Sequence, residues 1–167
     1  MPPTLDQRVA RLEERVDRLE RAPAPAAPDA IDRSATFWAL EGLKAQMPEP
    51  GGVLFTGAVT LADGHRAEWQ QAFTTPQVLD GFGPQAASDL SALAHPVRLL
   101  ILRELLEGER TTAQLAEHEQ LGTSGQIYHH LRQLVAAGWL RTTTRGVYRV
   151  PTERVVPLLT ILAAVTR

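Results

Sequence analysis

Apolar residues recur at helical spacing in the segment that follows Thr123. Steps of four, three and one separate Ile127, Leu131, Leu134 and Val135, so these side chains form one stripe along a helix. Thr123 and the glutamine three residues later have the spacing of a capping box, which predicts that the helix begins directly after Thr123. The polar side chains opposite the stripe should face solvent, and these are Gln126, His129, Arg132 and Gln133.

Two β-prone runs, residues 139–144 and 147–150, follow this helix and are joined around Arg145 and Gly146. A second capping-box pair, Thr111 and Gln114, predicts a shorter helix upstream. From residue 92 to residue 150 the predicted order is therefore helix, helix, tight turn, helix and hairpin. This order describes a winged helix-turn-helix, a mainly α fold with a small β component (α+β), and it makes double-stranded DNA the first partner to consider.

The charge pattern supports a nucleic-acid partner. Residues 120–152 contain no acidic residue and four arginines, a formal charge of plus four. The alternative interpretation is a solvated arginine face without a partner. Under the DNA-binding interpretation, the contacting residues of the helix are Thr123, Ser124, Gln126, Tyr128, His129, Arg132 and Gln133, and those of the wing are Arg141, Thr143, Arg145 and Arg149.

Several short motifs in this region resemble one family of bacterial regulators. They are Ala-Leu-Ala-His-Pro-Val-Arg at 92–98, Leu-Ile-Leu at 100–102, Thr-Thr-Ala-Gln-Leu-Ala at 111–116 and Tyr-His-His-Leu at 128–131. Their order and spacing resemble the ArsR-like (arsenical-resistance-repressor-like) winged-helix regulators over about half of the chain. The resemblance implies a homodimeric transcription factor with a recognition helix from about residue 124 to residue 137.

In that family a first and a last helix usually build the dimer. The corresponding last helix here spans residues 153–166 and has almost no polar face, so we expect it to be buried against a partner copy. The predicted contacts of this helix are Val155, Leu158, Leu159 and Leu162.

A second apolar pattern lies at the N-terminus. Alternating steps of four and three connect Leu5, Val9, Leu12, Val16 and Leu19, a heptad seam with leucine at d and valine at a, which favours two parallel strands. Only about two heptads are present, so the alternative is an amphipathic helix that packs on its own domain. We predict a coiled-coil helix at 1–21, a proline- and alanine-rich linker at 22–31, a helix plus β-hairpin input or assembly module at 32–84, and the winged-helix domain at 85–167.

The 32–84 module contains a helix at 32–47 and a hairpin. Val53, Phe55, Val59 and Leu61 share one face of the first strand, and a three-residue loop at 63–65 would bring the apolar residues of the second strand to the same face. This register pairs Val59 with Trp69 and Phe55 with Phe73. We expect the hairpin to pack on the 32–47 helix or on its own copy. Its aromatic residues form either a core or a ligand pocket, and the pocket would be lined by Trp38, Phe55, Trp69 and Phe73.

Composition excludes several classes of protein. The 167 residues include no cysteine, so neither thiolate-based sensing of arsenic, cadmium and lead nor a disulfide framework is available. The five histidines have no convincing metal-ligand spacing; His95 before Pro96 suits a helix cap, and His130 should be packed and hydrogen-bonded. No metal, cofactor, signal peptide or membrane span is predicted, and the expected location is the cytoplasm.

The two halves of the chain differ in charge. Residues 1–84 carry 8 basic and 12 acidic groups and residues 85–167 carry 9 and 7, as expected if only the second half meets DNA. No group of nucleophile, base and orienting residue indicates an enzyme. The sequence therefore predicts a sequence-specific DNA-binding transcriptional regulator, a dimeric repressor without thiol-based metal sensing, with a small-molecule or protein inducer left open. The alternative is a winged-helix protein–protein interaction module that assembles a larger complex.

Overall fold

The structure is a computed structural model that describes residues 5, 9, 11, 14, 36–144 and 146–166. The chain forms two compact units, the first of which ends at Gly42, and the second of which is Leu43–Arg167. Of the predicted coiled-coil seam, Leu5 and Val9 are helical and exposed, whereas Leu12, Val16 and Leu19 lie outside the described residues, as does the 22–31 linker. The coiled coil and the four domain boundaries stay predictions.

The helix predicted at 32–47 is α3 (Trp38–Gln46). It continues across the boundary of the first unit, and Phe37, Trp38 and Leu40 at its start are exposed. None of the helices in the described part of the chain combines the length and the apolar composition that crossing a bilayer requires.

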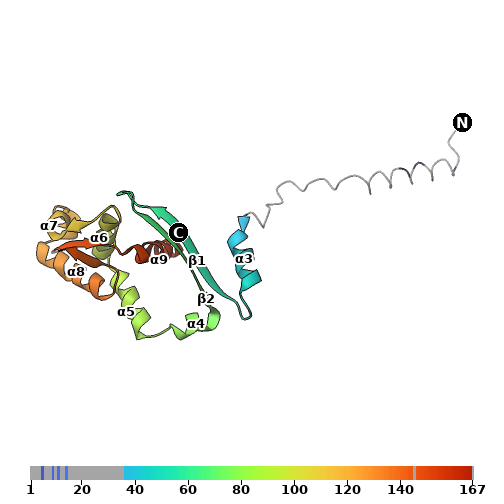
Figure 1. Cartoon of the computed structure of the whole chain (residues 1–167), viewed down its shortest axis with the longest axis horizontal. Coiled ribbons are helices and arrows are strands. Elements are labelled where there is room, and N and C mark those ends of the chain that lie inside the picture. Colours follow the sequence, from blue (N-terminus) through green and yellow to red (C-terminus); the bar gives the residue numbers. More distant parts are fainter. Residues whose placement is uncertain are drawn as a thin grey trace. The chain divides into compact units, whose positions relative to one another are not determined.

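The predicted winged helix-turn-helix is confirmed in the second unit (Figure 1). Its elements are α5 (Pro84–Leu93), α6 (Pro96–Leu106), β3 (Arg110–Thr111), α7 (Thr112–Leu115), the short 3-10 helix η1 (Glu119–Leu121), α8 (Ser124–Ala136), β4 (Arg141–Thr144), β5 (Val147–Arg149) and α9 (Thr152–Val165). The three wing strands form an antiparallel sheet in the order β3-β5-β4.

Local sequence signals explain where the helices of this domain begin. The side chains of Thr111 and Thr123 each accept a hydrogen bond from the backbone N–H of the glutamine three residues later. The side chain of that glutamine accepts from the backbone N–H of the threonine, so both predicted capping boxes are present. His95 caps α6 as predicted, since its Nδ1 accepts from the Val97 N–H at 3.2 Å. The stripe of α8 is buried at Ile127, Leu131 and Leu134.

The hairpin consists of β1 (Gly52–Thr60) and β2 (Arg66–Thr74), which are antiparallel. Its outermost pair is Gly52 with Thr74. The predicted three-residue loop length is confirmed, and Phe55, Val59 and Leu61 lie on the face that packs against the core, but Val53 at the end of the strand is 55% exposed. The predicted register was wrong, because the loop lies one residue earlier in the chain. Val59 pairs with Ala67 and Gly57 pairs with Trp69, so the three-residue loop is 62–64 rather than 63–65. The last residue of the observed loop is Gly64, with a φ of +84°. In the predicted loop this position would be His65, and a histidine adopts such a φ only with strain.

The hairpin packs on α9 of its own chain, which neither predicted arrangement included (Figure 1). Val156 of α9 approaches Gly57 so closely that a Cβ on the glycine would lie 2.8 Å from Val156 Cγ1. Phe55, Val59, Leu61 and Trp69 pack against the core of the winged helix, in which Ala67 is itself buried. The apolar surface of α9 therefore covers the hairpin, and this contact stabilises two strands that would be marginal alone.

Candidate DNA-binding surface

The outer face of α8 is open to solvent. Thr123, Ser124, Gln126, His129 and Arg132 are exposed. Tyr128 also belongs to this face, with 53% of its surface exposed. This face carries hydrogen-bonding groups and one guanidinium, which are the side chains that can contact base edges and phosphates.

Two of the predicted base-reading glutamines are already engaged within the protein. The Gln126 Oε1 accepts from the Thr123 N–H at 2.9 Å and from the Thr123 hydroxyl at 3.0 Å, so this side chain closes the capping box. Gln133 is half-buried, and its Oε1 accepts from the Arg98 guanidinium of α6. Its Nε2 also lies 3.1 Å from His129 Nε2. Ser124, Tyr128, His129 and Arg132 are the exposed residues of the predicted set on α8 that take no part in the capping box.

Arg98 is a positioning residue that the sequence interpretation did not single out. Its guanidinium donates to Gln133 on α8 and, at 2.8 Å, to the Ser91 carbonyl of α5. One side chain thus connects α5, α6 and α8. The arginine stands in the quoted motif at 92–98, but the motif alone does not tell which distant groups it reaches.

His130 packs at the border of the buried stripe, as predicted, but one of its ring nitrogens has no hydrogen bond. Its ring centroid lies 4.6 Å from that of His95, and its buried Nδ1 has no hydrogen-bond partner. Burial, followed by the charges of His95, Arg98 and His129, lowers the pKa of the His130 imidazole below its ordinary value. Within the described residues, no group of three or more His, Cys, Asp and Glu side chains could hold a metal ion.

The predicted wing arginines have acidic partners. Arg141 of β4 lies 2.7 Å from Glu153 of α9, and Arg149 of β5 lies 3.9 Å from Glu109. The exposed Thr143 hydroxyl lies 3.5 Å from Glu109 as well. Both acids stand outside the acid-free segment 120–152, so the fold brings negative charge to a region that the sequence pattern indicated was purely basic. Arg145 lies outside the described residues.

The predicted dimerisation residues of α9 divide into two groups. Val155 and Leu158 are buried in the chain's own core, so the expectation that they require a partner copy was wrong. The hairpin and the winged helix already cover them. Leu159 and Leu162 are half-buried and pack at the edge of this core.

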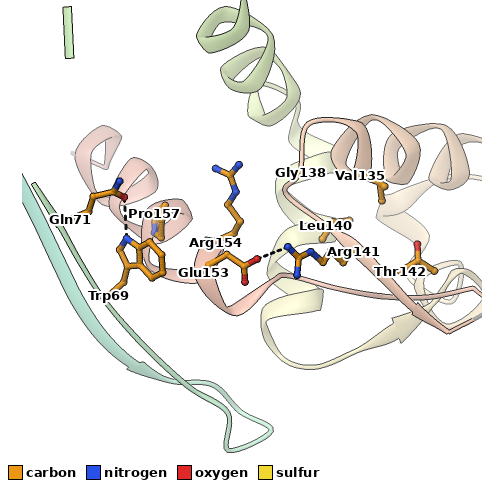
Figure 2. Close-up of a pocket in the computed structure, with 10 residues that line it drawn as sticks. All are labelled: Trp69, Gln71, Val135, Gly138, Leu140, Arg141, Thr142, Glu153, Arg154 and Pro157. Carbon is orange, nitrogen blue, oxygen red and sulfur yellow. Dashed lines mark hydrogen bonds and ion pairs between the residues drawn. The ribbon is translucent and has the colours of Figure 1, made fainter. Parts of the chain in front are cut away.

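Of the two alternatives for the aromatic cluster, a core or a ligand pocket, Phe55 and Trp69 take part in the core. Trp38 is 64% exposed, and Phe55 packs against the core. Trp69 lines a cavity of about 720 Å³, whereas Trp38, Phe55 and Phe73 do not. The cavity lies between β2, the end of α8, β4 and the first turns of α9 (Figure 2). Its walls are Trp69, Gln71, Val135, Gly138, Leu140, Arg141, Thr142, Glu153, Arg154 and Pro157.

The order of helices, the exposed α8 and the three-stranded wing define a winged helix-turn-helix protein. Residues 93–143 match a family model described as a helix-turn-helix domain. The match covers the segment from the end of α5 to β4 and confirms the predicted helix-turn-helix. No curated protein sequence matches the chain.

The chain is also similar to solved structures. Reduced HlyU from Vibrio cholerae is 26% identical with a TM-score of 0.40, over 52% of this chain and 96% of that chain. NolR from Sinorhizobium fredii is 27% identical with a TM-score of 0.42, over 57% and 95%. A structure described as an ArsR family transcriptional regulator is 26% identical with a TM-score of 0.39, over 48% and 84%.

Proposed function

We propose that this chain is a sequence-specific DNA-binding transcriptional regulator that represses as a homodimer. The observation that carries the proposal is the open face of α8, where Tyr128, His129 and Arg132 project from a helix whose other side is anchored in the core. A rigid helix that exposes hydrogen-bonding side chains beside a β wing suits insertion into the major groove of double-stranded DNA.

Each part of this surface has a distinct role in the proposal. His129 and Arg132 contact base edges, and the first turn of α8 offers backbone N–H groups to a phosphate. The wing arginines contact the DNA backbone. For Arg141 and Arg149 this requires an exchange of Glu153 and Glu109 for phosphate oxygens, and exposed ion pairs of this kind exchange at small cost because water and salt screen them.

The homodimer is supported by apolar groups that the chain does not cover fully. Leu5 and Val9 lie four residues apart in helical conformation and are 74% and 46% exposed. Leu159 and Leu162 of α9 are half-buried. We propose that α9 contributes the main interface and that the N-terminal seam strengthens the dimer or raises the order of the homo-oligomer.

The proposal includes neither thiol-based metal sensing nor catalysis. With no cysteine in 167 residues, the chain lacks thiolate ligands for arsenite, cadmium or lead. Of the histidines near α8, His95 is occupied as a helix cap and His130 is packed against it. An inducer, if the regulator has one, would be a small molecule or a protein.

A second candidate function is a winged-helix protein–protein interaction module. The ion pairs of Arg141 and Arg149 favour it, because they leave less unpaired positive charge on the wing than the sequence predicts. Leu79, Phe82 and Leu90 also expose apolar surface before and along α5.

Selection of bound fragments from random double-stranded DNA separates the two functions. A regulator that reads DNA as a dimer should enrich a palindromic motif with half-sites about one helical turn apart. The matched control is the variant His129→Ala/Arg132→Ala, which keeps the buried stripe of α8 and should lose the enrichment. If the parent chain enriches no motif, sequence-specific regulation is excluded and the interaction module becomes the better description.

A further inference from the structure

The cavity beside β4 has apolar surface on two sides and two arginines in its wall. Trp69 and Pro157 form apolar surface on the β2 and α9 side, and Val135 and Leu140 form it on the α8 side. The Trp69 indole is held in place because its Nε1 donates to Gln71 Oε1 at 3.2 Å. A volume of about 720 Å³ lies within the range of small-molecule sites, roughly 300–1,000 Å³.

The two arginines of the cavity are in different electrostatic states. Arg141 is paired with Glu153 at 2.7 Å. Among the described residues, no carboxylate lies within ion-pair distance of the Arg154 guanidinium, which instead lies over the Trp139 ring at 5.0 Å from its centroid. Figure 2 shows the Arg154 side chain between Trp69 and the Gly138–Leu140 segment. Arg154 therefore supplies an uncompensated positive charge to the cavity.

The Trp139 ring fixes where this charge lies. Trp139 is buried, and its Nε1 donates to the Asp89 carbonyl of α5 at 3.1 Å, so the ring is anchored to a neighbouring helix. A guanidinium held over a ring by its charge keeps N–H donors for an acceptor. Arg154 also stands in the first turn of α9, where the helix dipole adds partial positive charge.

We propose that this cavity binds a planar aromatic carboxylate. The carboxylate pairs with the Arg154 guanidinium through two parallel hydrogen bonds, and the aromatic body occupies the space beside Trp69 and Pro157. An anion is favoured because Arg141 and Arg154 outnumber the single acid, Glu153, in the cavity wall. This binding site does not depend on the DNA-binding function, because Arg154, Trp69 and Pro157 are not among the residues proposed to contact DNA.

Calorimetric titration of the full chain with 2-naphthoate and with its neutral isostere 2-naphthamide tests the site. The parent should bind naphthoate at least about tenfold more tightly than naphthamide, because only the carboxylate makes charge-assisted bonds to Arg154. Arg154→Met removes the charge but keeps an unbranched stem, and it should reduce naphthoate affinity to that of naphthamide. Trp69→Leu should weaken both probes by similar factors.

Two further variants make the test specific. Arg66→Met removes the same charge from an exposed position on β2, where Arg66 pairs with Glu68 outside the cavity, and it should leave the preference for naphthoate unchanged. Arg154→Lys keeps the charge and loses the planar fork, so it should retain part of the preference even if Arg154→Met folds poorly. Equal affinity of the parent for both probes, no binding in the millimolar range, or a full preference in both Arg154 variants would overturn the proposal.

Discussion

Val156 of α9 lies directly on Gly57 of β1, with 2.8 Å between Val156 Cγ1 and the position that a Cβ on the glycine would occupy. The close approach brings the hairpin onto the helix, and Val156 is only 2% exposed as a result. Gly57 is thus required for packing rather than for its backbone conformation, since its φ is not in the left-handed region.

We expect Gly57→Ala to lower the free energy of unfolding by about 1–3 kcal/mol, because the stiff, buried valine cannot move aside freely. Chemical denaturation measures the change. Gly125→Ala is the control, since a Cβ there meets open space within α8 and should not lower stability. The double variant with Val156→Ala should lose less stability than the two single variants summed, by at least about 0.5 kcal/mol. Additive losses would mean that the two residues do not press on each other.

Stability should decrease as the pH falls below the ordinary histidine pKa because of His130. The pKa of His130 is lower in the folded chain than in the unfolded chain. Between these two pKa values the unfolded chain binds the proton more readily, so the folded chain loses stability as the pH falls. The loss is complete once the pH lies below the pKa of the folded chain. The charges facing His130 are those of His95, Arg98 and His129.

His130→Gln removes this titration and should flatten the decrease between pH 7.5 and pH 5.5, measured by urea denaturation. His65→Gln, at an exposed position directly after the hairpin loop, is the matched control variant. A parent and a His130→Gln variant with identical profiles would contradict the assignment.

Residues on the open face of α8 should affect DNA sequence preference, and residues that brace the helix should affect stability. His129→Ala and Arg132→Ala should each cost about 1–3 kcal/mol at one position of the selected site. Gln133→Ala should instead lower the thermal midpoint, because it leaves the half-buried Arg98 without its partner on α8. Binding to the selected site and to a scrambled site separates the two effects. If His129→Ala and Arg132→Ala both bind like the parent, the reading face is misassigned.

DNA affinity should fall steeply with salt. If the dimer contacts about six phosphates, a fourfold rise in salt should weaken binding on the order of a thousandfold. Glu153→Gln releases Arg141 from its ion pair and should strengthen binding to all DNA sequences alike, by up to about fivefold. Arg145→Ala, at the predicted wing tip, should weaken all sequences similarly. Salt-independent binding in a fluorescence anisotropy titration would exclude the phosphate contacts.

Truncation should distinguish the contributions of the two proposed dimerisation elements. Removal of residues 1–31 should leave a DNA-competent dimer of lower stability or assembly order, because α9 remains. Leu162→Gln affects a half-buried side chain and should weaken the dimer, whereas Leu158→Gln, at a wholly buried position, should unfold the chain. Sedimentation measures the oligomeric state. A truncated chain that sediments as a monomer would assign the main interface to the N-terminal seam instead.

The features that could be predicted from the sequence are those created by residues close together in the chain. The stripe of Ile127, Leu131 and Leu134, the capping boxes of Thr111 and Thr123, and the two β-prone runs each depend on contacts within a few residues. Helical and strand periodicity makes such contacts visible as spacing. The helix-turn-helix and the face of α8 that meets solvent followed from them.

Only the tertiary structure decided which distant groups meet. Glu153 and Glu109 reach the wing arginines Arg141 and Arg149, and Arg98 reaches Gln133, although the partners lie far apart in the sequence. The hairpin shows the same limit, because its apolar face followed from alternation while its cover, α9, did not. Periodicity indicates which side of an element is apolar, but the partner of that side depends on how the elements pack, and here Gly57, which has no side chain, leaves room for Val156 of α9.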